Sequence, residues 1–275
     1  GLTNFVFAIN HVEGQFVIRL SPDPEKINVF EKEFWTTQKV RKIGVPTPEV
    51  LTVGNSMVPT PYMISRRVSG TEATHHPKRF EIIHELGRYA SLINSIPTDG
   101  FGKNFDWHEK KQFTRSSWLD YLDQEWLLAD RFRILEEQRM LLSRQAKVLR
   151  GIMEDAKKLQ EKPALNHGDL RLKNVIVDED GEITAIIDWE DSISTIAPHW
   201  DLSIALHDLS IDEKHLFIEG YGLSHADVEE MAPLMKALNI LNYATTVRRA
   251  VEEQDHKTLA ECQLRLHGCL DLFSL

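Results

Sequence analysis

The amino-acid sequence predicts an α+β fold of two lobes. Residues 1–67 alternate strand and helix signals, most of the sequence that follows has helical periodicity, and a short β-hairpin is embedded in this helical part between residues 164 and 190. We therefore expect a small N-terminal lobe over residues 1–67, built from an antiparallel sheet and one helix. A larger, mostly helical C-terminal lobe is expected over residues 68–275.

The N-terminal lobe begins with a predicted hairpin. Residues 5–9 and 15–20 are β-branched and aromatic runs on either side of a Glu-Gly turn, which is typical of paired strands. Apolar side chains recur near helical spacing over residues 24–43, with proline in the first turn and a Gly-Val-Pro sequence that ends the helix. Two more strands, at residues 49–53 and 62–65, are bounded by glycine and proline.

Beyond residue 70 the apolar residues recur mainly with the period of a helix. The expected helices span residues 78–96, 116–129, 136–160, 200–209, 213–221, 225–252 and 256–272. The exception is a pair of short strands, residues 175–177 and 183–187, joined by a Glu-Asp-Gly turn. Polar residues stand at both ends of this hairpin, which is where functional groups are commonly placed on a scaffold.

Composition excludes several classes of protein. The chain has 275 residues, 42% of them hydrophobic, and a formal charge of −10, so it can bury a full core and is not a disordered acidic tail. No basic stripe stands out against this acidic background, which argues against nucleic acid as a partner. The apolar runs are far shorter than the roughly 20 residues of a membrane-spanning helix, and the N-terminus lacks a signal-peptide profile. We expect a cytoplasmic protein with no membrane partner.

The two cysteines are expected to be core residues. Cys262 and Cys269 stand seven residues apart in a predicted helix, which separates them by about 10 Å along its axis. That separation excludes a disulfide between them. Two reduced thiols fit a reducing compartment.

Three polar residues around the embedded hairpin predict the chemistry. Asn174 follows Asp169 by five residues, and Asp188 ends the second strand. Phosphoryl transfer needs one carboxylate to accept the hydroxyl proton and aim the nucleophile, and it needs hard oxygen ligands for Mg²⁺ on the phosphates. Each residue taken singly is also a common turn former or helix cap. The three in this order predict a catalytic site, with Asp169 at the nucleophile and with Asn174 and Asp188 at the metal.

The sequence around these residues resembles a known family. His167-Gly-Asp-Leu170, Asn174 and Ile187-Asp-Trp-Glu190 are similar to motifs of the aminoglycoside phosphotransferase and choline kinase-like family of small-molecule kinases. The resemblance extends to Glu33 with the glycine- and proline-rich turn after its helix, and to Ala197-Pro-His-Trp-Asp-Leu202. It implies a bilobal protein kinase-like fold, ATP or GTP as the phosphoryl donor, and Mg²⁺ as the metal.

The resemblance also implies roles for single residues. Asp169 would be the catalytic base, Asn174 and Asp188 would bind magnesium, and Glu33 would pair with the cation that holds the nucleotide phosphates. Asp201 would support the catalytic loop.

The phosphate-binding cation departs from the pattern of the family. Its members and their protein-kinase relatives commonly have lysine on the third strand, whereas this sequence has Arg19, which keeps the charge but offers a planar fork of donors. We expect Arg19 and Glu33 to form an ion pair that faces the phosphates; the alternative for Arg19 is a surface position on the strand. Gly1-Leu-Thr-Asn4 is similar to the end of a nucleotide-covering loop, so the strand before this loop is expected to be missing from the sequence.

The nucleotide base is expected between the lobes. In a kinase the main chain of the strand-to-linker segment binds the edge of the base, and here that segment consists of Met63, Ile64, Ser65 and Arg66. Met63 would limit the size of the base pocket, or else is an ordinary core methionine.

The leading hypothesis for function is a kinase that transfers the γ-phosphoryl group of ATP or GTP to a hydroxyl of a small molecule. One alternative is a nucleotide-binding pseudokinase with a regulatory role, which Arg19 would support. Another is a metabolic kinase for a neutral or anionic acceptor. A protein kinase is disfavoured by the glycine after His167 and by the short distance from Asp188 to the next predicted helix.

The acceptor is inferred from the division of charge between the lobes. Residues 1–67 carry a net charge of +2 and residues 68–275 carry −12. Acidic residues lining the acceptor cleft would concentrate a cationic polyhydroxy compound such as an aminoglycoside, although solvated helix faces explain the same charge. The acidic residues considered for this cleft are Asp120, Asp123, Glu125, Asp130, Glu190 and Asp191.

Overall fold

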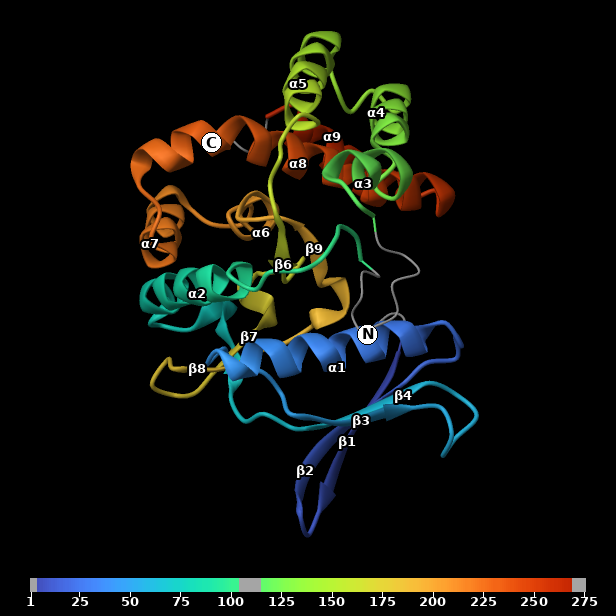
Figure 1. Ribbon diagram of the computed structural model, residues 1–275, viewed down its shortest axis with the longest axis vertical. Helices are drawn as coiled ribbons and strands as arrows, with labels where there is room; N and C mark the ends of the chain where they lie inside the picture. Colours follow the sequence, from blue (N-terminus) through green and yellow to red (C-terminus); the bar gives the residue numbers. More distant parts are fainter. Residues whose placement is uncertain (1–3, 104–114, 269–275) are drawn as a thin grey trace.

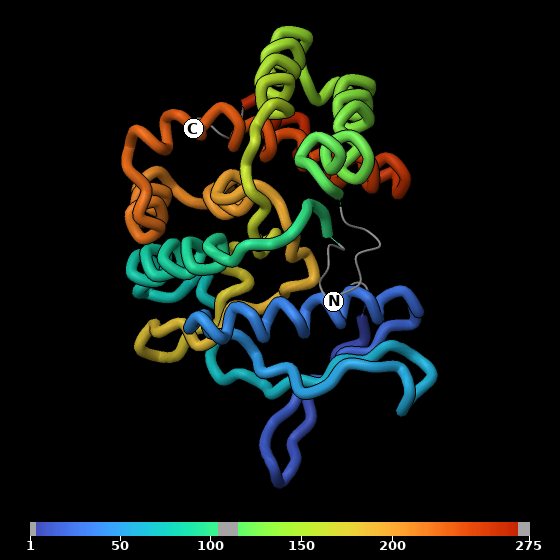
Figure 2. Tube along the Cα trace, in the orientation of Figure 1, coloured from blue at the N-terminus to red at the C-terminus, as the bar shows by residue number. Residues whose placement is uncertain are grey.

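The structure is a computed structural model that describes residues 4–103 and 115–268. It consists of a small part built on a β-sheet and a larger part built mostly of helices, one above the other in Figure 1 and Figure 2. This is the α+β arrangement of two lobes that the sequence predicts. We find no helix among the described residues with the length and hydropathy that crossing a bilayer requires.

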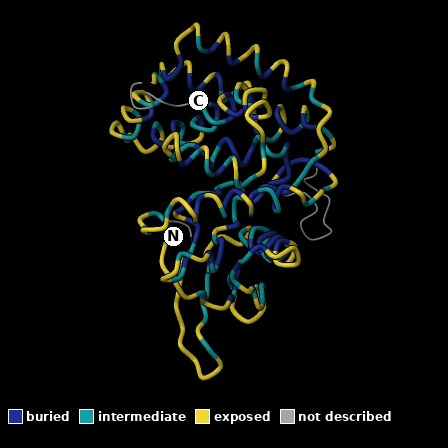
Figure 3. The backbone as a smooth tube through the Cα atoms, turned by 90° about the vertical axis from the view of Figure 1, so that its left-hand side faces the viewer, coloured by how far each residue is buried: buried dark blue, intermediate teal, exposed yellow. Residues whose placement is uncertain are grey.

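The N-terminal part is a four-stranded antiparallel sheet with one helix beside it. Strands β1 (Phe5–His11) and β2 (Gly14–Leu20) form the predicted hairpin, and β4 (Tyr62–Arg66) lies between β2 and β3 (Val50–Gly54). Helix α1 (Lys26–Lys42) runs along the sheet, between it and the helical part (Figure 1). Figure 3 shows that the hairpin projects away from the rest of the molecule and is largely exposed.

The described C-terminal part contains most of the predicted helices, but residues 116–160 form three helices where the sequence predicts two. Its helices are α2 (Arg79–Asn94), α3 (Trp118–Gln124), α4 (Leu128–Glu137), α5 (Ser143–Ala156), α6 (His199–Ala205), α7 (Ile211–Tyr221), α8 (His225–Glu252) and α9 (His256–Leu266). The helices predicted at 116–129 and 136–160 are divided differently, because Leu127 and Arg139 have positive φ angles of 55° each. A residue in the left-handed region cannot continue a right-handed helix, so α4 begins after the first of them and ends before the second.

Helix α8 is the centre of the helical part. It packs against α4, α5, α6 and α9. Its buried face includes Leu234, Leu238, Leu241, Ala244 and Val247, which recur at helical spacing. Cys262 of α9 packs into the same core as a free, buried thiol, whereas Cys269 lies outside the described residues.

Short strands frame the segment that carries the catalytic motif. The predicted hairpin is present as β7 (Val175–Val177) and β8 (Ile183–Ile186), and β5 (Thr71–Glu72) extends it. A separate two-stranded sheet pairs β6 (Pro163–Asn166) with β9 (Ile193–Ile196). The sequence did not predict β5, β6 or β9, because each pairs with a distant segment and, unlike β7 and β8, is not joined to its partner by a short turn.

Three short 3₁₀ helices complete the described structure: η1 (Ala73–His75), η3 (Leu172–Asn174) and η4 (Trp189–Asp191). The last two follow the catalytic loop and strand β8, respectively. They place Asn174 and Asp188 at element ends, where side chains can face a ligand.

Candidate active site

The catalytic loop lies between β6 and η3, and Asp201 of α6 holds it in place. The Asp201 carboxylate is fully buried and accepts hydrogen bonds from the main-chain N–H groups of His167 and Gly168, both at 2.9 Å. The side chain of Asn94 donates a third, at 3.1 Å. Burial raises the pKa of Asp201, while the hydrogen bonds that its carboxylate accepts act in the opposite direction. Asp201 therefore supports the loop without contacting a substrate, as the family resemblance implied.

Glycine at position 168 is required by this support. Gly168 has φ +85°, a conformation that residues with a side chain rarely adopt. A Cβ atom at this position would overlap the main-chain carbonyl of Asp191, which follows the second strand of the hairpin. The positive φ angle and the close approach of the Asp191 carbonyl therefore require glycine at the second position of the His-Gly-Asp motif.

His167 connects the loop to the end of β8. Its Nε2 lies 3.1 Å from the Ile187 carbonyl oxygen, and its Nδ1 lies 3.2 Å from the N–H of Asp169. A carbonyl only accepts and an N–H only donates, so the ring is neutral and carries its proton on Nε2. Burial lowers the pKa of His167, which agrees with the neutral form. The His167 ring is therefore hydrogen-bonded both to the loop of Asp169 and to the residue before Asp188.

Asp169 sits between two cations and an amide. Its Oδ1 accepts from Arg171 Nε at 2.6 Å, and its Oδ2 lies 2.8 Å from Lys173 Nζ. The side-chain nitrogen of Asn174 donates to Asp169 Oδ2 at 3.0 Å and to its main-chain oxygen at 2.8 Å. The structure thus brings two of the three predicted catalytic residues into direct contact. Arg171 and Lys173 were not selected from the sequence, although their positions two and four residues after Asp169 were a usable signal.

Asp188 follows β8 in a conformation that turns the chain sharply. It has φ 66° and ψ 56°, a left-handed conformation uncommon for a residue other than glycine, and its side chain is exposed. Although solvent reaches the carboxylate, the surrounding protein raises its pKa by desolvation and Glu190 adds to the shift. Arg19 counters that shift by Coulomb attraction, so a residue of the N-terminal part contributes to the electrostatic field at Asp188.

Arg19 and Glu33 form the predicted ion pair across β2 and α1. Arg19 Nη2 donates to Glu33 Oε1, and the same nitrogen lies 3.8 Å from the sulfur of Met63. Glu33 is buried, and desolvation raises its pKa while Arg19 acts against that shift. Arg19 also lies over the ring of Phe30, 5.1 Å from its centroid. The arginine is therefore held inside the N-terminal part and is not a surface strand residue.

Lys32, next to Glu33 on α1, was missed by the sequence analysis. Its side chain is 2% exposed, and its ammonium donates to the carbonyl oxygens of Glu190 and Ser192 at 2.8 and 2.9 Å. Burial lowers its pKa to about 7. Lys26 adds an ion pair with the Glu190 carboxylate at 2.8 Å. These contacts attach α1 to the segment after Asp188, so they set how the two parts of the molecule meet.

The main chain predicted to bind the base is already used by the sheet. Met63, Ile64 and Ser65 belong to an inner strand and pair with β2 on one side and β3 on the other. The N–H of Arg66 donates to the carbonyl oxygen of Glu49 at 2.8 Å. Because an inner strand uses its donors and acceptors on its two neighbours, Met63, Ile64 and Ser65 do not offer the expected groups, and the N–H of Arg66 is also engaged. In the linker after β4, by contrast, the main chain of Val68 has no hydrogen-bond partner among the described residues.

A cavity of about 650 Å³ opens beside Asp169 in the helical part. Aromatic side chains from α3, the α3–α4 turn and α6 form one part of its lining, namely Tyr121, Trp126 and Trp200. Polar side chains of α8, among them Asn242 and Thr246, form another part. Arg19, Glu33, Asn174 and Asp188 are not among its described lining residues, so the cavity extends from Asp169 into the helical part.

The acidic residues expected to line this cleft mostly do not. Of the six considered, Asp191 alone is among the described residues that line the cavity. The others are engaged elsewhere: Asp120 caps α3 through Ser117, Glu125 pairs with Arg115 at 3.5 Å, and Glu190 pairs with Lys26. The expectation of an acidic acceptor cleft is therefore wrong for the described residues, because a count of charges in sequence does not tell which face carries them.

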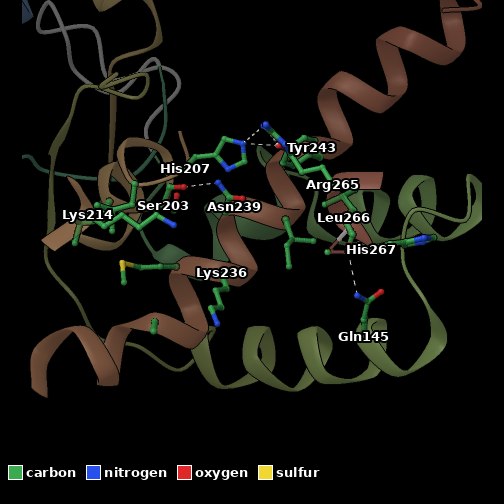
Figure 4. Close-up of a pocket in the computed structure, with 16 residues that line it drawn as sticks. Gln145, Ser203, His207, Lys214, Lys236, Asn239, Tyr243, Arg265, Leu266 and His267 are labelled. Atoms are coloured by element: carbon green, nitrogen blue, oxygen red, sulfur yellow. Dashed lines mark hydrogen bonds between the residues drawn. The ribbon is translucent and has the colours of Figure 1, made fainter. Parts of the chain in front are cut away.

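A second pocket of about 260 Å³ shares a wall with this cavity. Figure 4 shows that His207, Tyr243 and Arg265, which come from three separate segments, converge there. The hydroxyl of Tyr243 lies 2.7 Å from Nε2 of His207 and 3.0 Å from Nη1 of Arg265. Asn239 of α8 completes the shared wall and donates to the carbonyl of Ser203 at 2.6 Å.

Solved structures with the same fold are phosphotransferases. Aminoglycoside phosphotransferase APH(4)-Ia is 19% identical with a TM-score of 0.72, covering 100% of this chain and 92% of that one. The GDP and kanamycin complex of APH(2")-IIia is 15% identical with a TM-score of 0.66, covering 97% and 89%. Macrolide 2'-phosphotransferase MphH from Brachybacterium faecium is 14% identical with a TM-score of 0.63, also covering 97% and 89%. At these identities the likeness establishes the fold.

The sequence comparison establishes the family. No curated protein matches the chain at the significance level applied. The profile of the phosphotransferase enzyme family, however, matches residues 1–234, which include both the Arg19–Glu33 pair and the loops of Asp169 and Asp188. The chain therefore belongs to the phosphotransferase enzyme family and is a phosphotransferase with a bilobal, protein kinase-like fold.

Proposed function

We propose that the enzyme transfers the γ-phosphoryl group of ATP or GTP to a hydroxyl group of a small molecule. The observation that carries this proposal is the position of Asp169, which lines the cavity in the helical part and is hydrogen-bonded to Asn174. Enzymes of the same fold were solved with ADP and hygromycin B and with GDP and kanamycin. Those complexes support a nucleotide donor and a small-molecule acceptor for this chain.

Asp169 would aim the acceptor hydroxyl at the γ-phosphorus. The hydroxyl oxygen forms a bond to phosphorus, the bond from phosphorus to the β–γ bridging oxygen breaks, and the nucleoside diphosphate leaves with that electron pair. The hydroxyl proton passes to the Asp169 carboxylate and from there to water. Because the transition state of such transfers is loose, orientation of the nucleophile contributes more than proton removal. Arg171 and Lys173 would offset negative charge at the transferring group.

The residues at the metal position fit Mg²⁺. Asn174 uses its amide nitrogen as a donor to Asp169, which leaves the amide oxygen as a ligand. The Asp188 carboxylate has no hydrogen bond or ion pair within the described part of the chain. No group of three or more His, Cys, Asp or Glu side chains there could hold a metal. Two protein oxygens plus phosphate oxygens are the donor set that Mg²⁺ commonly takes, and the ion would neutralise phosphate charge when bound.

Arg19 would bind the nucleotide phosphates while Glu33 positions it. Glu33 occupies one guanidinium nitrogen of Arg19, and Arg19 Nε is buried without a hydrogen-bond partner among the described residues. A buried N–H left without an acceptor costs free energy, so a phosphate oxygen at that point would be stabilising. The planar fork of arginine can serve Glu33 and a phosphate at the same time.

The nucleotide base would be bound by the linker after β4. Within the described part of the chain, the main-chain N–H and C=O of Val68 have no hydrogen-bond partner, whereas the carbonyl of the next residue, Ser69, already accepts from Thr184 at 3.1 Å. One donor beside one acceptor is enough to bind the edge of either adenine or guanine. This placement replaces the segment Met63 to Arg66 as the site of base recognition.

The proposal is tested by transfer of label from [γ-³²P]ATP and [γ-³²P]GTP, with Mg²⁺, to a panel of aminoglycosides, macrolides, sugars, polyols and hydroxy acids. Label should appear in an acceptor and should disappear with Asp169→Asn. Calorimetric titration of AMP-PNP with Mg²⁺ runs alongside. Nucleotide binding without transfer to any acceptor would favour the pseudokinase alternative, and absence of nucleotide binding would remove the proposed function altogether.

A further inference from the structure

We propose that the acceptor is an anionic hydroxyl compound, bearing a carboxylate or a phosphate, which arginines of the helical part bind. This inference rests on the proposed function and deepens it. Among the described residues that line the cavity beside Asp169, six are lysine or arginine and two are acidic, although the whole chain has a net charge of −10. The cavity thus has the opposite sign to the protein as a whole.

The two acidic residues in the lining already have cationic partners. Asp169 is paired with Arg171 and Lys173, and Asp191 Oδ1 lies 2.7 Å from Lys103 Nζ. A cationic acceptor would therefore meet no unpaired carboxylate among the described lining residues. To bind either carboxylate, a cationic acceptor would have to displace the lysine or arginine already paired with it. These side chains are tethered beside the carboxylates, so their effective concentration exceeds that of a free acceptor.

Arg131 of α4 is a half-buried cation without a carboxylate partner among the described residues. Its Nε donates to the carbonyl of Trp126 at 2.7 Å and its Nη1 to the carbonyl of Leu241 at 3.0 Å. No carboxylate of the described residues lies within 4.0 Å of it. Burial lowers its pKa to about 10, so the side chain still carries its charge at neutral pH. An anion in the cavity would supply the counter-charge that this guanidinium lacks.

Two more arginines reach the cavity from helices remote in sequence. Arg249 of α8 has no ion-pair partner within the described part of the chain. Arg265 of α9 is 3.9 Å from Asp208, a residue outside the lining, and contacts Tyr243. Because these helices take no part in the nucleotide side of the site, their arginines are not explained by the phosphates of the donor. They point to an anionic group on the acceptor.

The other lining groups suit the hydroxyl-bearing part of such a compound. Asn242 and Thr246 stand on the same face of α8 as Arg249, at spacings of four and three residues. Trp126 and Trp200 form a buried apolar part of the lining, and Arg131 lies over the Trp126 ring, 4.4 Å from its centroid. The adjoining pocket in Figure 4 is also lined by positively charged residues, among them Lys214 and Lys236. No aspartate or glutamate is among its described lining residues.

The test compares matched probes of different charge on one carbon skeleton. With Mg²⁺ and AMP-PNP present, gluconate, glucose 6-phosphate, glucose and glucosamine are titrated calorimetrically at pH 7.5. We expect at least one of the two anionic probes to bind roughly tenfold or more tightly than glucose, as one charge-assisted hydrogen bond would produce, and glucosamine to bind most weakly. The affinity of the anionic probe should fall as salt is raised. Comparison of gluconate with glucose 6-phosphate separates a carboxylate from a phosphate.

Arg249→Gln should weaken the anionic probe roughly tenfold and leave glucose unchanged, because an exposed helix residue can be replaced without loss of the fold. Arg144→Gln of α5 is the control, because it removes one positive charge at an exposed residue that lines neither pocket and has no ion pair within the described part of the chain. Tighter binding of glucosamine, failure of both anionic probes, or equal effects of the two substitutions would overturn the inference and leave the kinase assignment intact. If AMP-PNP itself fails to bind, the proposed function falls and the inference falls with it.

Discussion

The carboxylate of Asp201 accepts a hydrogen bond from the main-chain N–H of Gly168 at 2.9 Å. The two residues stand 33 positions apart, on α6 and on the catalytic loop. Through this bond a helix of the C-terminal core supports the residue just before Asp169 from below. The position of Asp169, the carboxylate proposed to orient the nucleophile, thus depends on a buried contact made by its neighbour in sequence.

Gly168→Ala should therefore displace the loop that carries Asp169 and lower the turnover rate. Alanine at φ +85° is strained, and its Cβ would overlap the Asp191 carbonyl, so the loop must move away from Asp201. We expect kcat to fall at least 100-fold, measured by label transfer, because small displacements of reacting groups are costly. Gly151→Ala is the control: its Cβ meets no atom within 4 Å on α5, and it should stabilise the protein by about 0.5–1 kcal/mol. Near-normal turnover of Gly168→Ala would contradict the steric role.

Asp188→Ala should abolish turnover and leave the fold intact. Asp188 makes no described contact that folding depends on, whereas the proposed metal ion depends on its carboxylate. Loss of a preorganised electrostatic group commonly costs a factor of 10²–10³ in kcat. Asp180→Ala, in the exposed turn of the same hairpin, should behave as the wild type. If Asp188→Ala keeps more than about a tenth of the wild-type rate, magnesium is held elsewhere.

Asp169→Asn separates nucleophile orientation from nucleotide binding. Asparagine is nearly isosteric, but it has lost the carboxylate that faces Arg171 and Lys173. We expect kcat to fall by 10² or more while the dissociation constant of AMP-PNP stays within a few-fold. Stopped assays and calorimetry give the two numbers on the same preparation. A parallel loss of nucleotide affinity would move Asp169 into the metal site.

Two variants test whether the Arg19–Glu33 pair stabilises the fold and whether Arg19 also binds the nucleotide phosphates. Arg19→Met leaves a buried carboxylate alone and should lower the free energy of unfolding by about 3–5 kcal/mol. Arg19→Met/Glu33→Met removes both charges and should recover most of that stability. Nucleotide affinity should remain weak in both variants, because the phosphates have lost their donor. Recovery of AMP-PNP binding together with stability in the double variant would show that Arg19 is structural only.

Because the pKa of Lys32 is lowered in the folded protein, the free energy of unfolding should depend on pH. Its pKa is about 7 in the folded protein and 10.5 is the ordinary value, so between these pH values the unfolded chain binds more protons than the folded one. The free energy of unfolding should therefore rise with pH from about 7 towards 10, by up to about 1.4 kcal/mol per pH unit from this group. Below pH 7 both states are protonated and the contribution levels off.

Urea unfolding at pH 6.5, 8 and 9.5 checks this pH dependence. Lys32→Met should have a flatter profile than the wild type over that window. Lys42→Met, on the exposed end of the same helix, should keep the wild-type profile. Parallel profiles for wild type and Lys32→Met would mean that the Lys32 ammonium is not desolvated as the structure indicates.

Local sequence determined the N-terminal elements and the catalytic motif. The hairpin, the helix that carries Glu33, and the spacing of Asp169, Asn174 and Asp188 all depend on neighbours within a few residues. Side-chain period, turn residues and β-branching report such local structure directly. The ion pair of Arg19 with Glu33 followed from the strand and helix that present them.

Tertiary structure alone decided the partners that come from distant segments. Strands β6 and β9 have no internal signal, since each is stable only when paired with the other across about 30 residues of chain. The main chain of β4 became unavailable to a base because β2 and β3 lie on both sides of it. Lys32 is buried because the segment after Asp188 folds over it.

The charge of the residues that line the cavity beside Asp169 also depends on tertiary structure and could not be predicted from the sequence. The net charge of −12 over residues 68–275 is a property of the sequence, and it suggested an acidic cleft. The folded chain brings Arg131, Arg249 and Arg265 to one cavity and leaves most of the acidic residues outside it. Electrostatic potential depends on where charges lie and how deeply they are desolvated, so only the convergence of α4, α8 and α9 decides it.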